Sequence, residues 1–183
     1  MTKEEIVYQN WLDAGISDNF IFGRVMETYP DLCRELLEMI LDIKISKIEY
    51  PEREKVIEER LDSKGIRLDV YVKDNENRSF DLEMQISNRQ DLLKRMRYYQ
   101  SMIDLNGLKR GEKTYKKLGE SYIIFICPFD KFGKGRHIYT FRERCDEERS
   151  LTLDDGAVKI FLNTKGYIDD VDEDIKNFLN YSN

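Results

Sequence analysis

The stretch Ile66–Ile86, IRLDVYVKDNENRSFDLEMQI, contains two runs in which apolar and polar residues alternate. Alternation with a period of two is typical of a β-strand that buries one face. The runs cover residues 66–73 and 79–86, and the polar residues Asp74 to Arg78 between them indicate a turn. The stretch therefore predicts a β-hairpin whose two strands each have an apolar and a polar face.

Three functional side chains are predicted to share the polar face of this hairpin. If the turn is centred on Glu76, Asp69 lies directly opposite Glu83, and Gln85 follows on the same face. Opposed side chains in a hairpin have Cβ atoms about 5 Å apart, and a one-residue slip in register would separate them. The predicted apolar faces are Ile66, Leu68, Val70 and Val72 in the first strand, and Phe80, Leu82, Met84 and Ile86 in the second.

The chemistry of this trio favours a divalent metal ion. Two carboxylates about 5 Å apart repel each other unless a cation lies between them or one is protonated. A metal ion held by Asp69 and Glu83 meets the needs of phosphodiester hydrolysis, because it neutralises phosphate charge and activates water. Gln85 can donate a hydrogen bond to that water or to a phosphate oxygen. An ordinary solvated sheet also has a polar face, so the pattern alone leaves a structural explanation open.

The elements on either side of the hairpin indicate a mixed α/β sandwich. Helices are predicted from Asp18 to Pro30 and from Asp31 to Leu41, with a first strand over 43–48 and an exposed connection over 49–64. A helix ending near Gly107 and a buried strand over 122–127 follow the hairpin, and two short strands (137–142 and 158–162) and a helix (170–180) complete the chain. The predicted domains are an N-terminal segment (1–17), a core (18–130) and C-terminal strands and a helix that pack on it (131–183).

Composition restricts the class of protein and the kind of site. The chain has 183 residues, 40% of them hydrophobic and 36% charged, which is typical of one globular domain. We expect a cytoplasmic protein, because there is no signal-peptide pattern and no apolar run that could span a bilayer. The three cysteines are widely separated and His137 is the only histidine, so a metal site must rest on carboxylates, which favours Mg²⁺ or Mn²⁺.

Charge is distributed unevenly along the chain. The net charge of −6 argues against a nucleic-acid partner. However, residues 87–117 contain nine basic and three acidic residues, whereas residues 142–174 contain five basic and eleven acidic residues. A basic middle region next to the hairpin is compatible with one DNA-facing side. The predicted contacts to the DNA backbone are Lys94, Arg95, Arg97, Tyr98, Lys109 and Arg110, with Lys113, Lys116 and Lys117 extending the patch.

Several segments resemble one nuclease family. Asp69, thirteen intervening residues and Glu83-Met84-Gln85 are similar to the signature of the PD-(D/E)xK superfamily, an Asp followed by (Asp/Glu)-x-Lys. The wider context resembles the PD-(D/E)xK family of transposases, which includes the recombination-promoting nucleases of bacteria. The segments that carry this resemblance lie within residues 18–168 and read FDLEMQ, KRMRYYQSMI, GEKTYKKLGESYIIFICPFD and IFLNT.

The resemblance implies a restriction-endonuclease-like α-β-β-β-α-β core, Mg²⁺-dependent DNA endonuclease activity and a bacterial mobile-element setting. It implies that Asp69 and Glu83 are the metal ligands and that Gln85 takes the position of the Lys. The superfamily often adds a Glu from the first helix, for which Glu35 and Glu27 are the candidates. Cutting both strands of DNA would favour a homodimer.

Two alternatives remain open on sequence grounds. A degenerate nuclease fold would keep DNA or protein binding without cleavage. An interaction protein that uses its acidic C-terminal region would bind a protein partner and would show no salt-dependent affinity for DNA.

Overall fold

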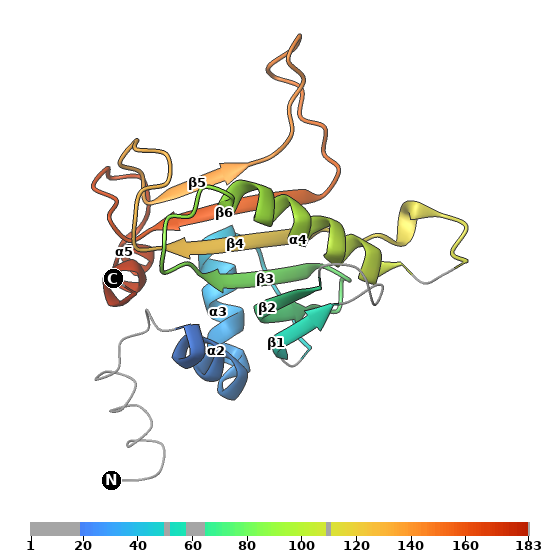
Figure 1. The fold of residues 1–183 in the computed structure, drawn as a ribbon, viewed down its shortest axis with the longest axis horizontal. Coiled ribbons are helices and arrows are strands. Elements are labelled where there is room, and N and C mark those ends of the chain that lie inside the picture. Colours follow the sequence, from blue (N-terminus) through green and yellow to red (C-terminus); the bar gives the residue numbers. More distant parts are fainter. Residues whose placement is uncertain (1–18, 50–51, 58–64, 109–110, 183) are drawn as a thin grey trace.

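The computed structural model describes residues 19–49, 52–57, 65–108 and 111–182. Six strands form one mixed sheet in the order β1-β2-β3-β4-β6-β5 (Figure 1). The strands are β1 (Glu52–Ile57), β2 (Ile66–Lys73), β3 (Ser79–Met84), β4 (Ser121–Cys127), β5 (Ile138–Phe141) and β6 (Ala157–Asn163). The helices in these ranges are α2 (Asn19–Thr28), α3 (Pro30–Leu41), α4 (Leu92–Gly107), α5 (Glu173–Tyr181) and the 3₁₀ turn η1 (Tyr115–Lys117).

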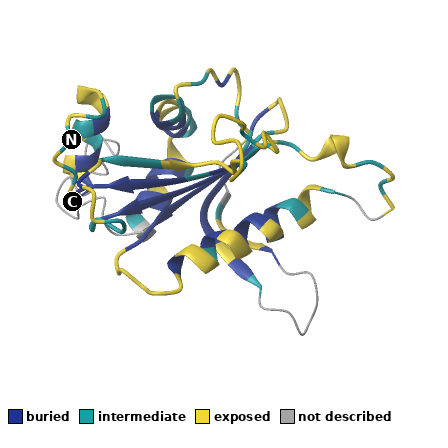
Figure 2. Cartoon of the chain, turned by 90° about the horizontal axis from the view of Figure 1, so that it is seen from above, coloured by how far each residue is buried: buried dark blue, intermediate teal, exposed yellow. Residues whose placement is uncertain are grey.

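Helices cover both faces of the sheet. Apolar residues of α2, α3 and α5 pack in one cluster with β2, β3, β4 and β6. On the opposite face, residues of α4 pack in a second cluster with β1, β2, β4 and β6. Figure 2 shows the buried central strands between these layers. The predicted mixed α/β sheet flanked by helices is therefore confirmed.

The C-terminal strands belong to this same sheet. β6 pairs in parallel with β4, and β5 pairs antiparallel with β6 at the edge. The two strands that follow residue 130 therefore extend the central sheet, and α5 packs on its face with α2 and α3. Among the described helices none is long and apolar enough to cross a membrane.

The first strand lies further along the chain than the sequence predicted. The prediction of a strand over 43–48 is wrong, because Ile48 makes only an isolated bridge to Asp74 and Ile45 packs in the core beside α3. Residues 52–57, which were predicted to lie in an exposed connection, form β1 and pair with β2. An edge strand pairs with a neighbouring strand along one edge only, and charged residues are common in it. The charged sequence of β1, EREKVI, therefore lacks the apolar pattern by which strands are predicted.

The hairpin strands are more deeply buried than alternation implies. Every residue of β3 is buried, and in β2 only Arg67 is exposed and Lys73 intermediate, so the prediction of half-buried hairpin strands is wrong. The prediction that Ile66, Leu68, Val70 and Val72 share one face is also wrong. Ile66 and Leu68 pack in the cluster beneath α4, whereas Val70 and Val72 pack in the cluster on the other side of the sheet. This change coincides with the end of the β2–β3 ladder at the pair Val70–Leu82.

Candidate metal centre and nucleic-acid cleft

The hairpin has the register on which the predicted facing of Asp69 and Glu83 depended. The pairs Val72–Phe80, Tyr71–Asp81 and Val70–Leu82 confirm a turn centred on Glu76. Beyond Val70 the strands no longer pair, and side chains replace the ladder. The Asp69 amide donates to Glu83 Oε1 at 2.8 Å, and the Met84 amide donates to Asp69 Oδ2 at 3.3 Å. The two carboxylates are therefore held between the diverging strands.

Helix α4 contributes a cation to this pair. Arg95 Nη2 lies 2.6 Å from Glu83 Oε2, and Nη1 donates to Gln85 Oε1 at 3.0 Å. Its Nε donates to the Tyr99 hydroxyl at 2.9 Å, and the guanidinium carbon lies 5.0 Å from the centre of the Tyr99 ring. Gln85 Nε2 also donates to Glu83 Oε2, at 3.3 Å. Sequence reasoning assigned Arg95 to the DNA backbone, but the structure places it among Glu83, Gln85 and Tyr99.

Burial and mutual repulsion raise the pKa values of the carboxyl groups. The pKa of Glu83 rises to about 8, first because burial disfavours its charge and second because Asp69 is close, against the opposing effect of Arg95. Burial is also the main cause that raises the pKa of Asp69. The pKa of Asp81 lies well above its usual range because of burial and then of Glu83 and Asp69. Neither oxygen of Asp81 has a hydrogen-bond partner in the part of the chain that the structure describes.

The donor set fits a hard divalent cation. Asp69 and Glu83 offer carboxylate oxygens on adjoining strands, and the raised pKa values show that a second positive charge would be favourable there. The described residues contain no group of three or more metal-binding side chains. Mg²⁺ is often held by one or two carboxylates together with water and substrate phosphate. The pair Asp69 and Glu83 is compatible with this mode of binding.

A cleft of about 670 Å³ opens beside the carboxylates, between the β2–β3 end and the start of α4. Four cationic side chains and two aspartates line it, so its charge favours an anion. Of the predicted DNA contacts, Lys94, Arg95 and Tyr98 line the cleft. The lining also includes Arg67, Arg89, Asp69, Asp91, Gln85 and the exposed Ile86.

The other predicted residues lie elsewhere. Glu35 is 65% exposed and lines an apolar groove between α3 and α5, and Glu27 pairs with Arg24 on the surface of α2. The structure therefore does not bring Glu35 or Glu27 to Asp69 and Glu83. Arg97 is exposed on α4 but outside the cleft lining. Lys109 and Arg110 lie outside the described residues.

Sequence reasoning missed Arg67 and Arg89 in the cleft, and it missed the inward direction of Arg95. One signal for Arg95 was available. It lies three residues after Leu92 and four before Tyr99, both of which belong to the buried stripe of α4. A cation at that helical spacing faces the sheet and needs a partner there.

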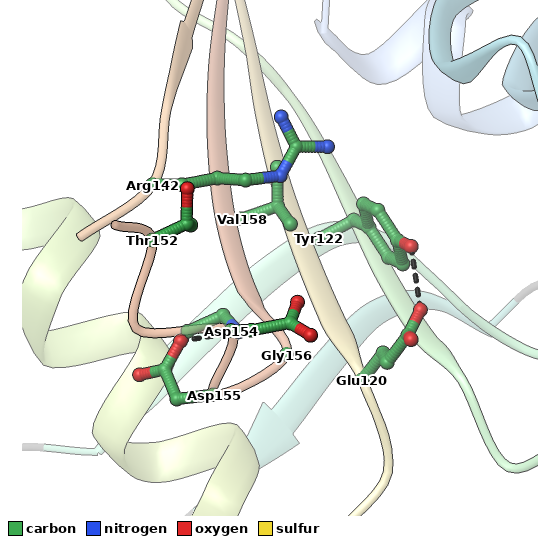
Figure 3. A pocket seen from close by; sticks show the side chains of 9 residues that line it. Glu120, Tyr122, Arg142, Thr152, Asp154, Asp155, Gly156 and Val158 are labelled. Atoms are coloured by element: carbon green, nitrogen blue, oxygen red, sulfur yellow. Dashed lines mark hydrogen bonds between the residues drawn. The ribbon is translucent and has the colours of Figure 1, made fainter. Parts of the chain in front are cut away.

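A second, smaller hollow of about 130 Å³ lies where β4 and β6 begin (Figure 3). Glu120, Asp154 and Asp155 line it with one cation, Arg142. The Tyr122 hydroxyl donates to Glu120 Oε2 at 2.6 Å. This acidic surface would repel a phosphate backbone, which leaves the cleft beside α4 as the better nucleic-acid face.

The raised pKa values predict how stability depends on pH. Between about pH 4.5 and pH 8 the unfolded chain has released the Glu83 proton while the folded protein retains it. The free energy of unfolding of the metal-free protein should therefore fall as pH rises through this window. We expect melting in the presence of a chelator to occur several degrees lower at pH 8 than at pH 5.5. Glu83→Gln should reduce this dependence, and identical pH profiles for the two proteins would contradict the assignment.

The chain is similar to one family of known proteins. A family model described as PD-(D/E)XK nuclease family transposase matches residues 19–165. The match includes β1 to β6, both carboxylates of the hairpin and all of α4. Searches of curated proteins and of solved structures found no significant match.

Proposed function

Because the chain belongs to the PD-(D/E)XK nuclease family of transposases, we propose that it is a Mg²⁺- or Mn²⁺-dependent DNA endonuclease. The observation that carries this proposal is the pair of buried carboxylates, Asp69 and Glu83, held together beside a cation-lined cleft. Family membership alone is compatible with a binding protein. The proposal of cleavage rests on this pair, because burial and mutual repulsion raise the pKa values of both carboxyl groups, and a bound divalent cation would offset both effects.

We assign each residue of the site a separate role in phosphodiester hydrolysis. Asp69 and Glu83 would hold the ion, which supplies Lewis-acid stabilisation of the phosphate and a water of lowered pKa. Gln85 lies beside Glu83 and would orient the attacking water or a phosphate oxygen through its amide. Arg67, Arg89 and Lys94 would position the DNA backbone in the cleft. These contacts are to phosphates, so we expect weak sequence preference.

The direct test is nicking of supercoiled plasmid by purified protein with Mg²⁺ or Mn²⁺ and with a chelator. We expect metal-dependent conversion to nicked circles. Linear product formed without an excess of nicked circles would indicate that two copies act together. Absence of cleavage with every divalent metal would overturn the enzyme proposal. If salt-dependent DNA binding remained in that case, the protein would be a binding module.

Removal of a cleft cation should weaken DNA binding in a salt-dependent way. Lys94→Gln is expected to lower the affinity for a short duplex several-fold and to reduce the slope of log K against log salt by about 1. Fluorescence anisotropy without divalent metal measures both quantities. Lys176→Gln is the matched control, because Lys176 of α5 lies across the sheet from α4 and pairs with Asp169 and Glu173. Equal effects of the two substitutions would argue against binding in the cleft.

A further inference from the structure

In the proposed reaction, the negative charges of the site and substrate exceed the positive charge of one divalent ion. One divalent ion offsets the two carboxylates of Asp69 and Glu83, which leaves the phosphodiester and the negative charge that develops in its transition state. Gln85 is neutral and can offer only dipoles. A further cation at the reacting phosphate would therefore lower the barrier, because preorganised charge is most effective in a water-excluded site.

Arg95 is held where that cation is needed. Glu83, beside it, is completely buried, whereas the Arg95 side chain is 28% exposed and lines the cleft. Its guanidinium thus connects the buried carboxylate to the space where substrate would lie.

The guanidinium has donors left for a ligand. Each terminal nitrogen carries two N–H groups. In the part of the chain that the structure describes, Nη2 has Glu83 as its acceptor and Nη1 has Gln85. One N–H group of each nitrogen therefore remains to donate to a phosphate oxygen.

Aromatic rings fix the plane of this group. The guanidinium carbon lies 5.0 Å from the Tyr99 ring centre and 5.7 Å from that of Phe125, and Nε donates to the Tyr99 hydroxyl. A cation fixed in this way loses little freedom when a phosphate binds.

We propose that Arg95 is a catalytic residue whose remaining N–H groups bind the scissile phosphate and supply the positive charge that Gln85 lacks. This inference rests on the proposed endonuclease function and adds a role for a residue of α4. It also makes Arg95 a competitor of the metal ion, because its ion pair occupies Glu83 Oε2. Loss of Arg95 should therefore slow cleavage without weakening the binding of metal.

The experiment compares Arg95→Gln, Arg95→Lys and the double variant Gln85→Lys/Arg95→Gln with the wild type in single-turnover cleavage at saturating DNA. We expect Arg95→Gln to slow the rate about 100-fold. The rate of Arg95→Lys should lie between the rates of the wild type and Arg95→Gln, because an ammonium group keeps the positive charge but lacks the planar arrangement of N–H donors. The double variant should recover about tenfold, since its introduced lysine restores a cation beside Glu83.

Calorimetric titration of Mg²⁺ without DNA gives a readout that is independent of activity. Arg95→Gln is expected to bind Mg²⁺ at least as tightly as the wild type. A purely structural role predicts loss of both metal affinity and rate with no recovery in the double variant, and that result would overturn the proposal. Arg149→Gln on the exposed β5–β6 connection is the control for loss of one guanidinium.

Two outcomes separate this inference from the function on which it rests. Absence of wild-type cleavage overturns the endonuclease proposal itself. Wild-type cleavage with an unchanged rate in Arg95→Gln overturns the role of Arg95 alone. If Arg95→Gln fails to fold, the cleavage rate of Arg95→Lys decides instead. The proposal would be overturned if Arg95→Lys cleaved at the wild-type rate and its rate depended on DNA concentration as that of the wild type does.

Discussion

Asp69→Asn is expected to reduce plasmid nicking about 1,000-fold, because a metal ion contributes several kcal/mol to such a reaction and each 1.36 kcal/mol is tenfold in rate. The substitution removes one of the two proposed carboxylate ligands and leaves the shape of the side chain. The stability of Asp69→Asn should not fall, although its nicking activity does. Asp69 is buried with a raised pKa and raises the pKa of Glu83, so its removal relieves repulsion. We expect an equal or higher melting temperature at pH 8.

The control for this experiment is Asp31→Asn, the same substitution at a carboxylate that is 95% exposed on α3. It should nick at the wild-type rate. If Asp69→Asn nicked plasmid as fast as the wild type, either the activity would belong to a contaminant or Asp69 would not hold the metal. A melting temperature far below that of the wild type would show that Asp69 serves the fold.

Gly119→Ala is expected to destabilise the protein by about 3 kcal/mol, at the upper end of what overpacking costs. A Cβ at residue 119 would overlap the carbonyl oxygen of Asn77, which is backbone and cannot rotate away. This contact lies where the chain enters β4. The Ser79 amide donates to the carbonyl of Glu120 at 2.8 Å, and the parallel pairing of β3 with β4 begins at Ser79–Ser121.

The effect should be visible as a melting temperature about 10 °C lower, since 1 kcal/mol shifts the midpoint by roughly 2–4 °C for a domain of this size. Gly107→Ala is the matched control. A Cβ there meets only the end of the flexible Leu118 side chain, at 3.3 Å, and alanine is the better helix former at the end of α4. A similar loss of stability in both variants would argue against the close approach of Gly119 to Asn77.

The hairpin illustrates what alternation can predict. The polar turn and the period of two predicted the hairpin, and the assumed turn centre on Glu76 is the register that brings Asp69 to Glu83. Alternation did not reveal the second layer, because α4 buries the polar face of the hairpin while α2, α3 and α5 bury the apolar face. The divergence of the strands after Val70, where side chains replace backbone partners, also has no local signal.

The residues of the cleft show a second limit of sequence reasoning. Local charge predicted a basic region after the hairpin, and Lys94 and Tyr98 do line the cleft. Arg67 and Arg89 join them because the hairpin and the start of α4 meet in space. Glu35 does not reach the cleft, because its face of α3 is directed toward α5.

The sequence by itself determined the mixed α/β class and the hairpin, because these depend on periodicity and on near neighbours. It placed Asp69 opposite Glu83 only on the condition of a turn centred on Glu76, and the structure supplied that register. Only the tertiary structure decided that the pair is buried, that β1 is drawn from a charged segment, and that Arg95 faces Glu83 and Gln85. These features depend on which surfaces meet when α4 and the edge strand pack on the sheet. The burial of a charge and the choice of its partner are settled by that packing and not by the local order of residues.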